Sequence, residues 1–252
     1  MIVTIDGKEV VCEPGELLLS IAERAGISIP ALCHHEGFPE QGCCRVCIVE
    51  VAPYVHSETV RREIVAACIY PVDRECTVFT DSERIRRNRG IALALLRARA
   101  PASDEIGRLC RVYGAPDLKQ FTTQSENEKC ILCGLCVKAC ESLGTGAIST
   151  VGRGVGKKVS TPYDEPALVC VGCGSCAAVC PTGAIPVTED NGVRTIWGKK
   201  LPLALCKRCG TAFGTMFELY RASEHSGSPP PEFCPECRRK AITDTIADTF
   251  GH

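Results

Sequence analysis

Residues 130–140 read CILCGLCVKAC, and residues 170–181 read CVGCGSCAAVCP. Each stretch holds three cysteines separated by two residues and a fourth separated by three, a C-x2-C-x2-C-x3-C run. Three thiols so close together on one curled loop can face a common centre, and glycine suits such loops because it tolerates positive φ. The two halves form an internal repeat, since residues 146–148 and 183–185 both read Gly-Ala-Ile.

This double run has the spacing of bacterial-type ferredoxins, which hold two [4Fe–4S] clusters. In these proteins the last cysteine of each run serves the other cluster. We therefore expect a crossed assignment of ligands. One cluster takes Cys130, Cys133, Cys136 and Cys180, and the other takes Cys170, Cys173, Cys176 and Cys140.

The overall composition points to metal-bound cysteines. The chain has 252 residues and 20 cysteines, too many for an ordinary soluble protein. Extracellular disulfides are the alternative, but the start MIVTIDGKEV has no secretory leader pattern, and no apolar run is long enough to span a membrane. We expect a cytoplasmic protein without direct membrane insertion. The net charge of −1 gives no indication of nucleic-acid binding.

The N-terminal residues predict a β-hairpin followed by a helix. Asp6-Gly7 is a strong hairpin turn between two apolar stretches. Apolar residues then recur at helical spacing from Leu17 to Ala25, and Gly26 is placed to end that helix.

A further candidate ligand set follows this hairpin and helix, and its members are Cys33, Cys44, Cys47 and Cys68. Plant-type [2Fe–2S] ferredoxins use C-x4-C-x2-C and a distant fourth cysteine, whereas the first gap here has ten residues. We still expect a [2Fe–2S] cluster, because a hairpin and a helix precede the cysteine loop. Only Cys44 forms C-x2-C with Cys47, so Cys43 is left out. A zinc site or scattered core thiols are the alternatives.

Residues 1–80 resemble the N-terminal β-grasp domain of the large iron–sulfur subunit of respiratory complex I. The same domain opens many [FeFe] hydrogenases and the small diaphorase subunit of NAD-linked [NiFe] hydrogenases. The resemblance rests on Ile5-Asp6-Gly7, Ile29-Pro30, Leu32-Cys33, Cys44-Arg45-Val46-Cys47, Ala67-Cys68 and Pro71-Val72. One departure is the long gap between Cys47 and Cys68, where residues 52–61 look like an extra loop.

The next segment departs from complex I more strongly. There the resemblance implies another [4Fe–4S] cluster, bound by one histidine and three cysteines. Residues 97–125 of this chain contain no histidine and only Cys110, so we expect that cluster to be absent. A capping box at Thr80 to Glu83 predicts a helix running toward Pro101, and Ser103 to Tyr113 predicts a short helix. The arginines of the first helix indicate a solvated face or a docking surface for an acidic partner.

Two C-x2-C pairs end the chain, formed by Cys206, Cys209, Cys234 and Cys237. Two such pairs are typical of four-thiolate zinc sites, so we expect one Zn²⁺ in a ribbon, with a further [4Fe–4S] cluster as the alternative. A helix over about residues 239–248 is expected to follow. The remaining thiols, Cys12, Cys43, Cys76 and Cys110, are expected to be buried in cores.

The predicted fold class is α+β with four segments. Residues 1–80 form a β-grasp [2Fe–2S] ferredoxin domain, 81–125 a helical connector, 126–192 a dicluster [4Fe–4S] module, and 193–252 a zinc-ribbon-like domain with a C-terminal helix. The expected cofactors are one [2Fe–2S] cluster, two [4Fe–4S] clusters and one Zn²⁺.

No dinucleotide fingerprint is present in the sequence, and no substrate site was found. The expected function is therefore relay of single electrons within an oxidoreductase complex. The resemblance implies a flavin- and NAD(P)-binding diaphorase subunit as one partner. It implies a catalytic subunit of the hydrogenase or formate dehydrogenase type as the other, in a complex that can be electron-bifurcating. A free-standing ferredoxin shuttle and a redox-sensing or assembly protein are the alternatives.

Overall fold

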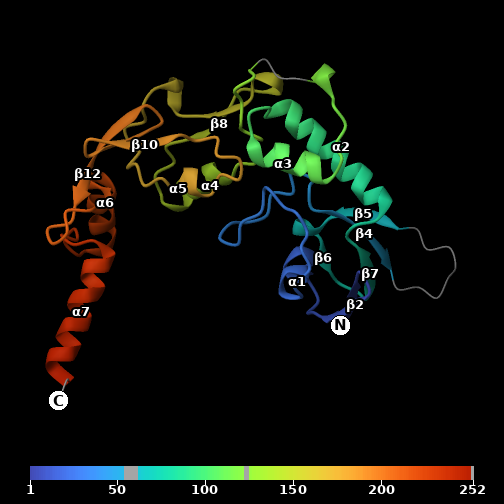
Figure 1. The fold of residues 1–252 in the computed structure, drawn as a ribbon, viewed down its shortest axis with the longest axis horizontal. Helices are drawn as coiled ribbons and strands as arrows, with labels where there is room; N and C mark the ends of the chain where they lie inside the picture. Colours follow the sequence, from blue (N-terminus) through green and yellow to red (C-terminus); the bar gives the residue numbers. More distant parts are fainter. Residues whose placement is uncertain (54–61, 122–124, 251–252) are drawn as a thin grey trace. The chain divides into compact units, whose positions relative to one another are not determined.

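The computed structural model describes residues 1–53, 62–121 and 125–250, in two compact units (Figure 1). Unit 1 comprises Met1–Lys138, Gly152–Lys158 and Val179–Ala184. Unit 2 comprises Ala139–Val151, Val159–Ala178 and Ile185–His252. Most of the extra loop expected at residues 52–61 lies outside the described residues.

Unit 1 is built on a five-stranded mixed sheet in the order β2-β1-β7-β4-β5. The strands are β1 (Ile2–Ile5), β2 (Lys8–Val11), β4 (Ile48–Pro53), β5 (Glu63–Ala66) and β7 (Cys76–Phe79). Strand β1 pairs antiparallel with β2 and parallel with β7. A separate two-stranded sheet joins β3 (Glu16–Leu17) to β6 (Pro71–Val72).

The expected hairpin and helix are present at the N-terminus. Asp6 and Gly7 form the turn between β1 and β2, with φ of 47° and 84°, as a two-residue hairpin turn requires. Helix α1 (Leu18–Arg24) buries Leu18, Leu19, Ile21 and Ala22 in the same core as Val3 and Ile5 of β1. Gly26, with φ of 74°, follows the last turn of α1, as predicted.

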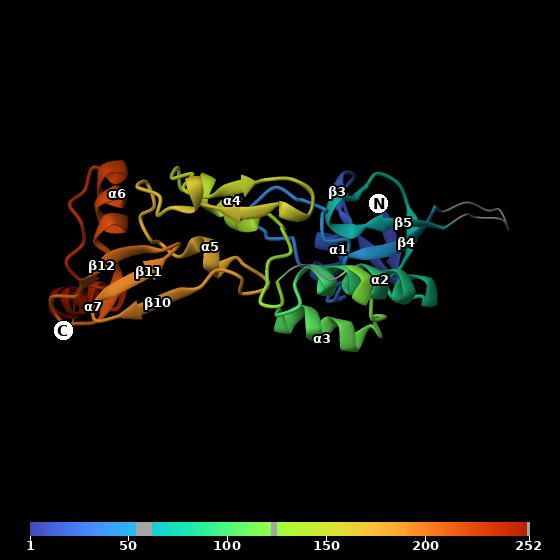
Figure 2. The same ribbon diagram turned by 90° about the horizontal axis from the view of Figure 1, so that it is seen from above.

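Helices α2 (Glu83–Arg99) and α3 (Asp104–Val112) pack against each other in unit 1 (Figure 2). Ser103 caps α3 by accepting a hydrogen bond from Ile106 N–H, in agreement with the short helix predicted there. The predicted capping box for α2 is wrong. Ser82 caps α2, whereas the Thr80 hydroxyl donates to the carboxylate of Asp6 at 2.5 Å. The two preferred cap residues are only two positions apart, and the tertiary contact with Asp6 decides between them.

One arginine of α2 does not lie on a solvated face. Arg89 is 1% exposed, and its guanidinium donates to the carbonyls of Val46 at 2.9 Å, Ile48 at 2.7 Å and Thr80 at 3.1 Å. Its charge also lies 4.9 Å from the centre of the Tyr113 ring. Burial lowers the pKa of Arg89 from its ordinary value. Arg89 therefore ties α2 to the backbone around Cys47.

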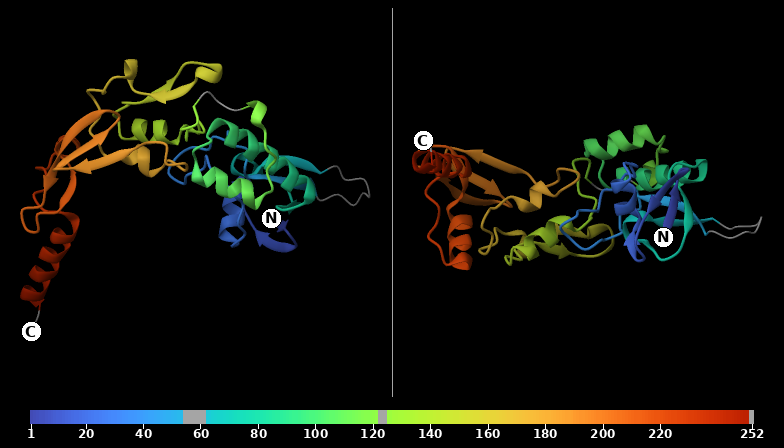
Figure 3. Two further views of the ribbon diagram at one scale, coloured as in Figure 1. Left: turned by 45° about the horizontal axis from the view of Figure 1, so that its top comes forward. Right: turned by 90° about the horizontal axis from the view of Figure 1, so that it is seen from below.

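Unit 2 contains a four-stranded antiparallel sheet in the order β10-β11-β12-β13. The strands are β10 (Val187–Asp190), β11 (Val193–Ile196), β12 (Lys199–Leu205) and β13 (Ala212–Thr215). Helix α6 (Met216–Ser226) follows and packs on β12 and β13, and α7 (Pro235–Phe250) extends away from this sheet (Figure 3). Thr215 and Glu218 form a complete capping box at the start of α6.

The remaining elements are short. They are α4 (Leu135–Ser142), α5 (Ser175–Ala178), β8 (Ser149–Val151), β9 (Lys158–Ser160) and the 3-10 turns η1 (Ala67–Ile69), η2 (Lys119–Phe121), η3 (Gly154–Gly156) and η4 (Pro162–Asp164). Among the described residues, no helix is both long enough and apolar enough to cross a membrane.

Replacing Arg89 with leucine is expected to destabilise unit 1. The leucine fills space but leaves three buried carbonyls without their donors, which costs about 2–4 kcal/mol. The thermal midpoint, followed by loss of cluster absorbance, is expected to fall by about 5–15 °C.

The matched control is Arg86→Leu, on the same helix. Arg86 is exposed and pairs with Asp81 at the surface, so its replacement should change the midpoint little. Equal midpoints for the two variants would show that the buried contacts of Arg89 contribute nothing.

Candidate metal centres

The four N-terminal candidate ligands come from three places in unit 1. Cys33 lies in the loop after α1, Cys44 and Cys47 lie just before β4, and Cys68 lies in η1. All four are buried. Arg45, between Cys44 and Cys47, has φ of 56°, which is uncommon for a residue with a side chain and curls the loop toward its cysteines.

The structure brings these four thiols together. The Cys33 thiol contacts the thiols of Cys44 and Cys68, and Cys68 also contacts Cys47. The backbone N–H of Cys44 donates to Cys33 Sγ at 3.4 Å. The thiol hydrogen bonds strongly lower the pKa of Cys33, and the bond from Cys68 lowers that of Cys47 to about 7 despite burial. The same thiol contacts raise the pKa of Cys44 and Cys68. The four sulfurs therefore lie close enough to share hydrogen bonds, as a common metal centre requires.

Cys43 differs from the expectation of a buried core thiol, because it is exposed. Its thiol also contacts Cys33, and its Sγ lies 3.8 Å from the carbonyl oxygen of Cys133. Cys43 and Cys44 are neighbours on the curled loop, and Cys44 is buried whereas Cys43 remains exposed. Cys12 and Cys76 are buried in the sheet core, and Cys110 Sγ lies 3.6 Å from the Leu93 carbonyl.

Cys180, the last cysteine of the second run, lies near Cys130 and Cys133 of the first run. All three belong to unit 1, as does Cys136. Burial above all, together with the thiols of Cys180 and Cys130, raises the pKa of Cys133 to about 11. The N–H of Leu132 donates to Cys130 Sγ at 3.4 Å, so the loop supplies a backbone donor to a candidate ligand.

The second run has its own cavity in unit 2. Its lining includes the four cysteines of the second expected set, namely Cys140, Cys170, Cys173 and Cys176. Apolar and backbone groups of Ala147, Ile148, Val171, Ile196 and Trp197 complete the wall. Four thiols around one cavity with few other polar groups fit a cubane with one cysteine on each iron.

The fourth cysteine of each run is held in the same way in both halves of the repeat. Cys140 Sγ lies 3.1 Å from the Thr145 hydroxyl and accepts from Ala147 N–H at 3.2 Å. Cys180 Sγ lies 3.6 Å from the Thr182 hydroxyl and accepts from Ala184 N–H at 3.3 Å. These donors suit a ligand sulfur, because hydrogen bonds to sulfur help to set cluster potentials.

The N-terminal set and the first cysteine run share one apolar core in unit 1. Cys33, Cys44 and their neighbour Val46 belong to that core. Ile131, Cys133 and Leu135 from the first run belong to it as well. Leu93 of α2 and Ile106 and Leu109 of α3 complete it. Helices α2 and α3 thus pack against both sets of candidate ligands.

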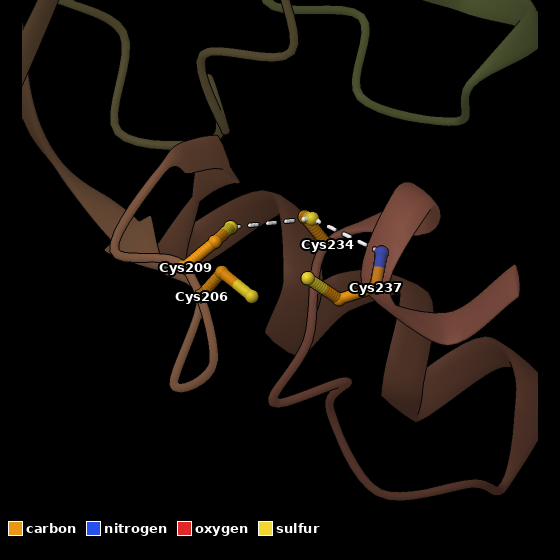
Figure 4. Close-up of side chains that lie close together, drawn as sticks. All are labelled: Cys206, Cys209, Cys234 and Cys237. Carbon is orange, nitrogen blue, oxygen red and sulfur yellow. Dashed lines mark hydrogen bonds between the residues drawn. The ribbon is translucent and has the colours of Figure 1, made fainter. Parts of the chain in front are cut away.

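The C-terminal pairs also meet in one place (Figure 4). The four thiol sulfurs of Cys206, Cys209, Cys234 and Cys237 lie within 4.8 Å of one another. Cys206 and Cys209 follow β12, and Cys234 and Cys237 flank the start of α7. Burial raises the pKa of the Cys206 thiol, but N–H groups of Cys234 and Cys209 outweigh it, and its pKa is about 6. A single tetrahedral metal fits four thiols at this spacing.

Sequence reasoning missed one side chain at the second cysteine run. The indole Nε1–H of Trp197 lies 3.5 Å from Cys176 Sγ, and Trp197 lines the same cavity. A tryptophan beside the Gly198 turn gives no local signal of this contact, since it depends on how the C-terminal sheet packs.

Comparisons with known proteins agree with this layout. The model of the 2Fe-2S iron-sulfur cluster binding domain matches residues 1–83, and that of the 4Fe-4S dicluster domain matches residues 129–184. The fold class is α+β with these two domains and a C-terminal four-cysteine group.

Two curated relatives illustrate the similarity. An NADH-quinone oxidoreductase subunit of Rhizobium meliloti is 30% identical over 234 residues, covering 83% of this chain and 26% of that protein. The NADPH-Fe(3+) oxidoreductase subunit alpha of Geobacter sulfurreducens is 31% identical over 231 residues, covering 82% of this chain and 26% of that protein. The chain thus spans about a quarter of the length of these relatives.

A solved structure is similar over more of its length. In the crystal structure of NAD+-reducing [NiFe]-hydrogenase in the H2-reduced state, one chain is 27% identical, with a TM-score of 0.60. The match covers 73% of this chain and 85% of that chain. The chain is homologous to this hydrogenase subunit and to the N-terminal region of the complex I large subunit. It is an iron–sulfur chain resembling electron-transfer subunits of NAD(P)-linked oxidoreductases.

Serine variants of Cys43 and Cys44 distinguish the two neighbouring thiols. Because Cys44 is 4% exposed and Cys43 is exposed, Cys44→Ser is expected to lose the [2Fe–2S] absorbance and Cys43→Ser to keep it. The visible spectrum and the iron content measure this directly. The reverse pattern would make Cys43 the ligand.

Proposed function

We propose that this chain relays single electrons between a flavin subunit that oxidises NAD(P)H and a catalytic subunit of the hydrogenase or dehydrogenase type. The observation that carries the proposal is the shared core of unit 1. Cys33 of the N-terminal set and Cys133 of the first run belong to one continuous apolar cluster. Cys43 Sγ, next to the N-terminal set, also lies 3.8 Å from the Cys133 carbonyl oxygen, which supports direct electron transfer between the two sets.

The proposed ligands of the [2Fe–2S] cluster are Cys33, Cys44, Cys47 and Cys68. Their mutual thiol contacts, their burial and the Cys44 N–H bond to Cys33 support the assignment. The buried guanidinium of Arg89 also supports it, because a fixed positive charge next to this loop offsets the negative charge of a thiolate-bound cluster. When bound, the cluster takes up and releases one electron at a time.

The proposed ligands of the two [4Fe–4S] clusters are the crossed sets. The division of the chain into units supports this, since Cys180 falls in unit 1 with the first run and Cys140 falls in unit 2 with the second. The influence of Cys180 on the pKa of Cys130 and the influence of Cys140 on that of Cys170 support it too. Cys140 also lines the cavity formed by Cys170, Cys173 and Cys176, which an uncrossed assignment does not explain.

The proposed occupant of the C-terminal site is one Zn²⁺, held by Cys206, Cys209, Cys234 and Cys237. Two pairs on separate backbone segments support a structural site, because closing all four positions with protein thiolates leaves none open for chemistry. The metal would tie β12 to the start of α7. We propose that this C-terminal segment, residues 193–252, docks a partner subunit.

Iron counts in double variants test the crossed assignment. The unaltered protein is expected to hold about ten irons and about one zinc, from one [2Fe–2S] cluster, two cubanes and a four-thiolate site. Cys130→Ser with Cys180→Ser removes two ligands of the same cubane, so about six irons remain. Cys130→Ser with Cys140→Ser removes a ligand from each cubane, so about two remain.

Zinc is the internal control in these measurements and should stay at about one in every variant. An uncrossed protein gives the opposite iron pattern for the two informative variants, with about two irons in Cys130→Ser with Cys180→Ser and about six in Cys130→Ser with Cys140→Ser. About fourteen irons with no zinc would replace the proposed Zn²⁺ with a third cubane.

Anoxic purification of the chain from its native host tests the relay. We expect stable co-purification with a flavin subunit and a catalytic subunit, and reduction of all three clusters when NADH or NADPH is added to the complex. The isolated chain should not be reduced by either nucleotide. A monomer that exchanges electrons freely with many acceptors would contradict the complex and favour a ferredoxin shuttle.

A further inference from the structure

The turn between β11 and β12 carries a residue that such turns disfavour. Ile196 pairs with Lys199, so Trp197 and Gly198 form a two-residue turn, with φ of 51° and 71°. Two positive φ values define the hairpin turn that prefers asparagine or aspartate followed by glycine. A bulky aromatic residue with positive φ is an outlier, and outliers of this kind persist where the surroundings hold them in place.

The same sheet contains the ordinary form of this turn. Asp190 pairs with Val193, and the turn between β10 and β11 is Asn191-Gly192, with φ of 49° and 75°. The two hairpins therefore have the same length and backbone shape. Only the first turn residue differs, so the tryptophan at 197 is explained by its side chain rather than by its backbone.

That side chain reaches the second cysteine set. The indole Nε1–H lies 3.5 Å from Cys176 Sγ, and the ring lines the cavity bounded by the four cysteines. An N–H donor at this distance favours negative charge on the sulfur.

A cation lies two residues further along the same hairpin. The ammonium of Lys199 donates to the carbonyls of Leu168 at 2.6 Å and Cys170 at 2.7 Å. These bonds fix the backbone at the start of the second run. They also place a positive charge beside Cys170.

We propose that the β11–β12 hairpin sets the reduction potential of the cubane held by Cys140, Cys170, Cys173 and Cys176. Reduction adds one electron from an external donor and leaves the ligand bonds intact. The reduced cluster carries one more negative charge, so an N–H donor and a cation stabilise it more than the oxidised one. The hairpin therefore raises this potential. The inference rests on the proposed ligand sets.

Phenylalanine at position 197 isolates the contribution of the N–H group. Trp197→Phe keeps an aromatic ring in the cavity but removes the donor. In a redox titration of the whole chain followed by electron paramagnetic resonance, one cubane wave is expected to shift to lower potential by about 59 mV, which is a tenfold change for a one-electron couple. The other cubane wave and the [2Fe–2S] wave should stay in place.

Two further variants and one control test the hairpin without relying on how a phenylalanine ring packs at position 197. Trp197→Asn installs the residue found at the equivalent position 191 and should lower the same wave. Lys199→Gln removes the cation and should lower it as well, whereas Lys200→Gln, an exposed neighbour, should not. The inference is overturned if the wave stays in place in both Trp197→Phe and Lys199→Gln, or if all three waves move together.

The outcomes also separate this inference from the proposed function. Unchanged potentials with about ten irons and intact co-purification leave the relay standing and remove only the role of the hairpin. Two cubanes that are missing from the unaltered protein would remove the relay itself.

Discussion

The structure depends on left-handed backbone at fixed places in the cysteine loops. Leu132 and Gly134 in the first run have φ of 57° and 78°, and Gly172 and Gly174 at the matching places have 73° and 78°. This shape turns backbone N–H groups toward sulfur, as Leu132 does toward Cys130. Position 172 needs glycine for a second reason, because a Cβ there would lie 2.9 Å from Leu201 Cδ1. The C-terminal sheet thus packs directly on the second loop, and it does so through a residue that the first loop replaces with leucine.

Metal bound at the cysteine sites is expected to contribute much of the stability of this fold. No disulfide joins the cysteines of the described residues. Metal binding and folding are coupled in such proteins, because the ligand geometry does not exist in the unfolded chain. The shared core of Cys33 and Cys133 joins the two cysteine sets of unit 1, and residues 97–125 between them contain no histidine. Helices α2 and α3 pack against both cysteine sets there, and Arg89 anchors α2 to the first of them.

The sequence predicted correctly those elements that depend only on neighbouring residues, such as a turn type or a helix cap. The Asp6-Gly7 hairpin, the end of α1 at Gly26 and the helix after Ser103 need only a turn type or a cap, and all three are present. The predicted cap of α2 at Thr80 is wrong, because the Thr80 hydroxyl binds Asp6, which follows the distant strand β1. The hairpin at Asn191-Gly192 was overlooked although its turn signal is strong. The roles of Arg89 and Trp197 could not be predicted, because each is defined by contacts with segments more than twenty residues away or across the sheet.

In the proposed relay, the N-terminal cluster and the first cubane lie close enough to exchange electrons directly. Electron paramagnetic resonance of the fully reduced chain tests this through spin–spin coupling between the two centres. We expect a [2Fe–2S] signal that is sharp when only that cluster is reduced, and that splits or broadens once the first cubane is also reduced. In Cys130→Ser with Cys180→Ser it should stay sharp at every potential. A spectrum that is always the simple sum of independent centres would contradict the direct relay.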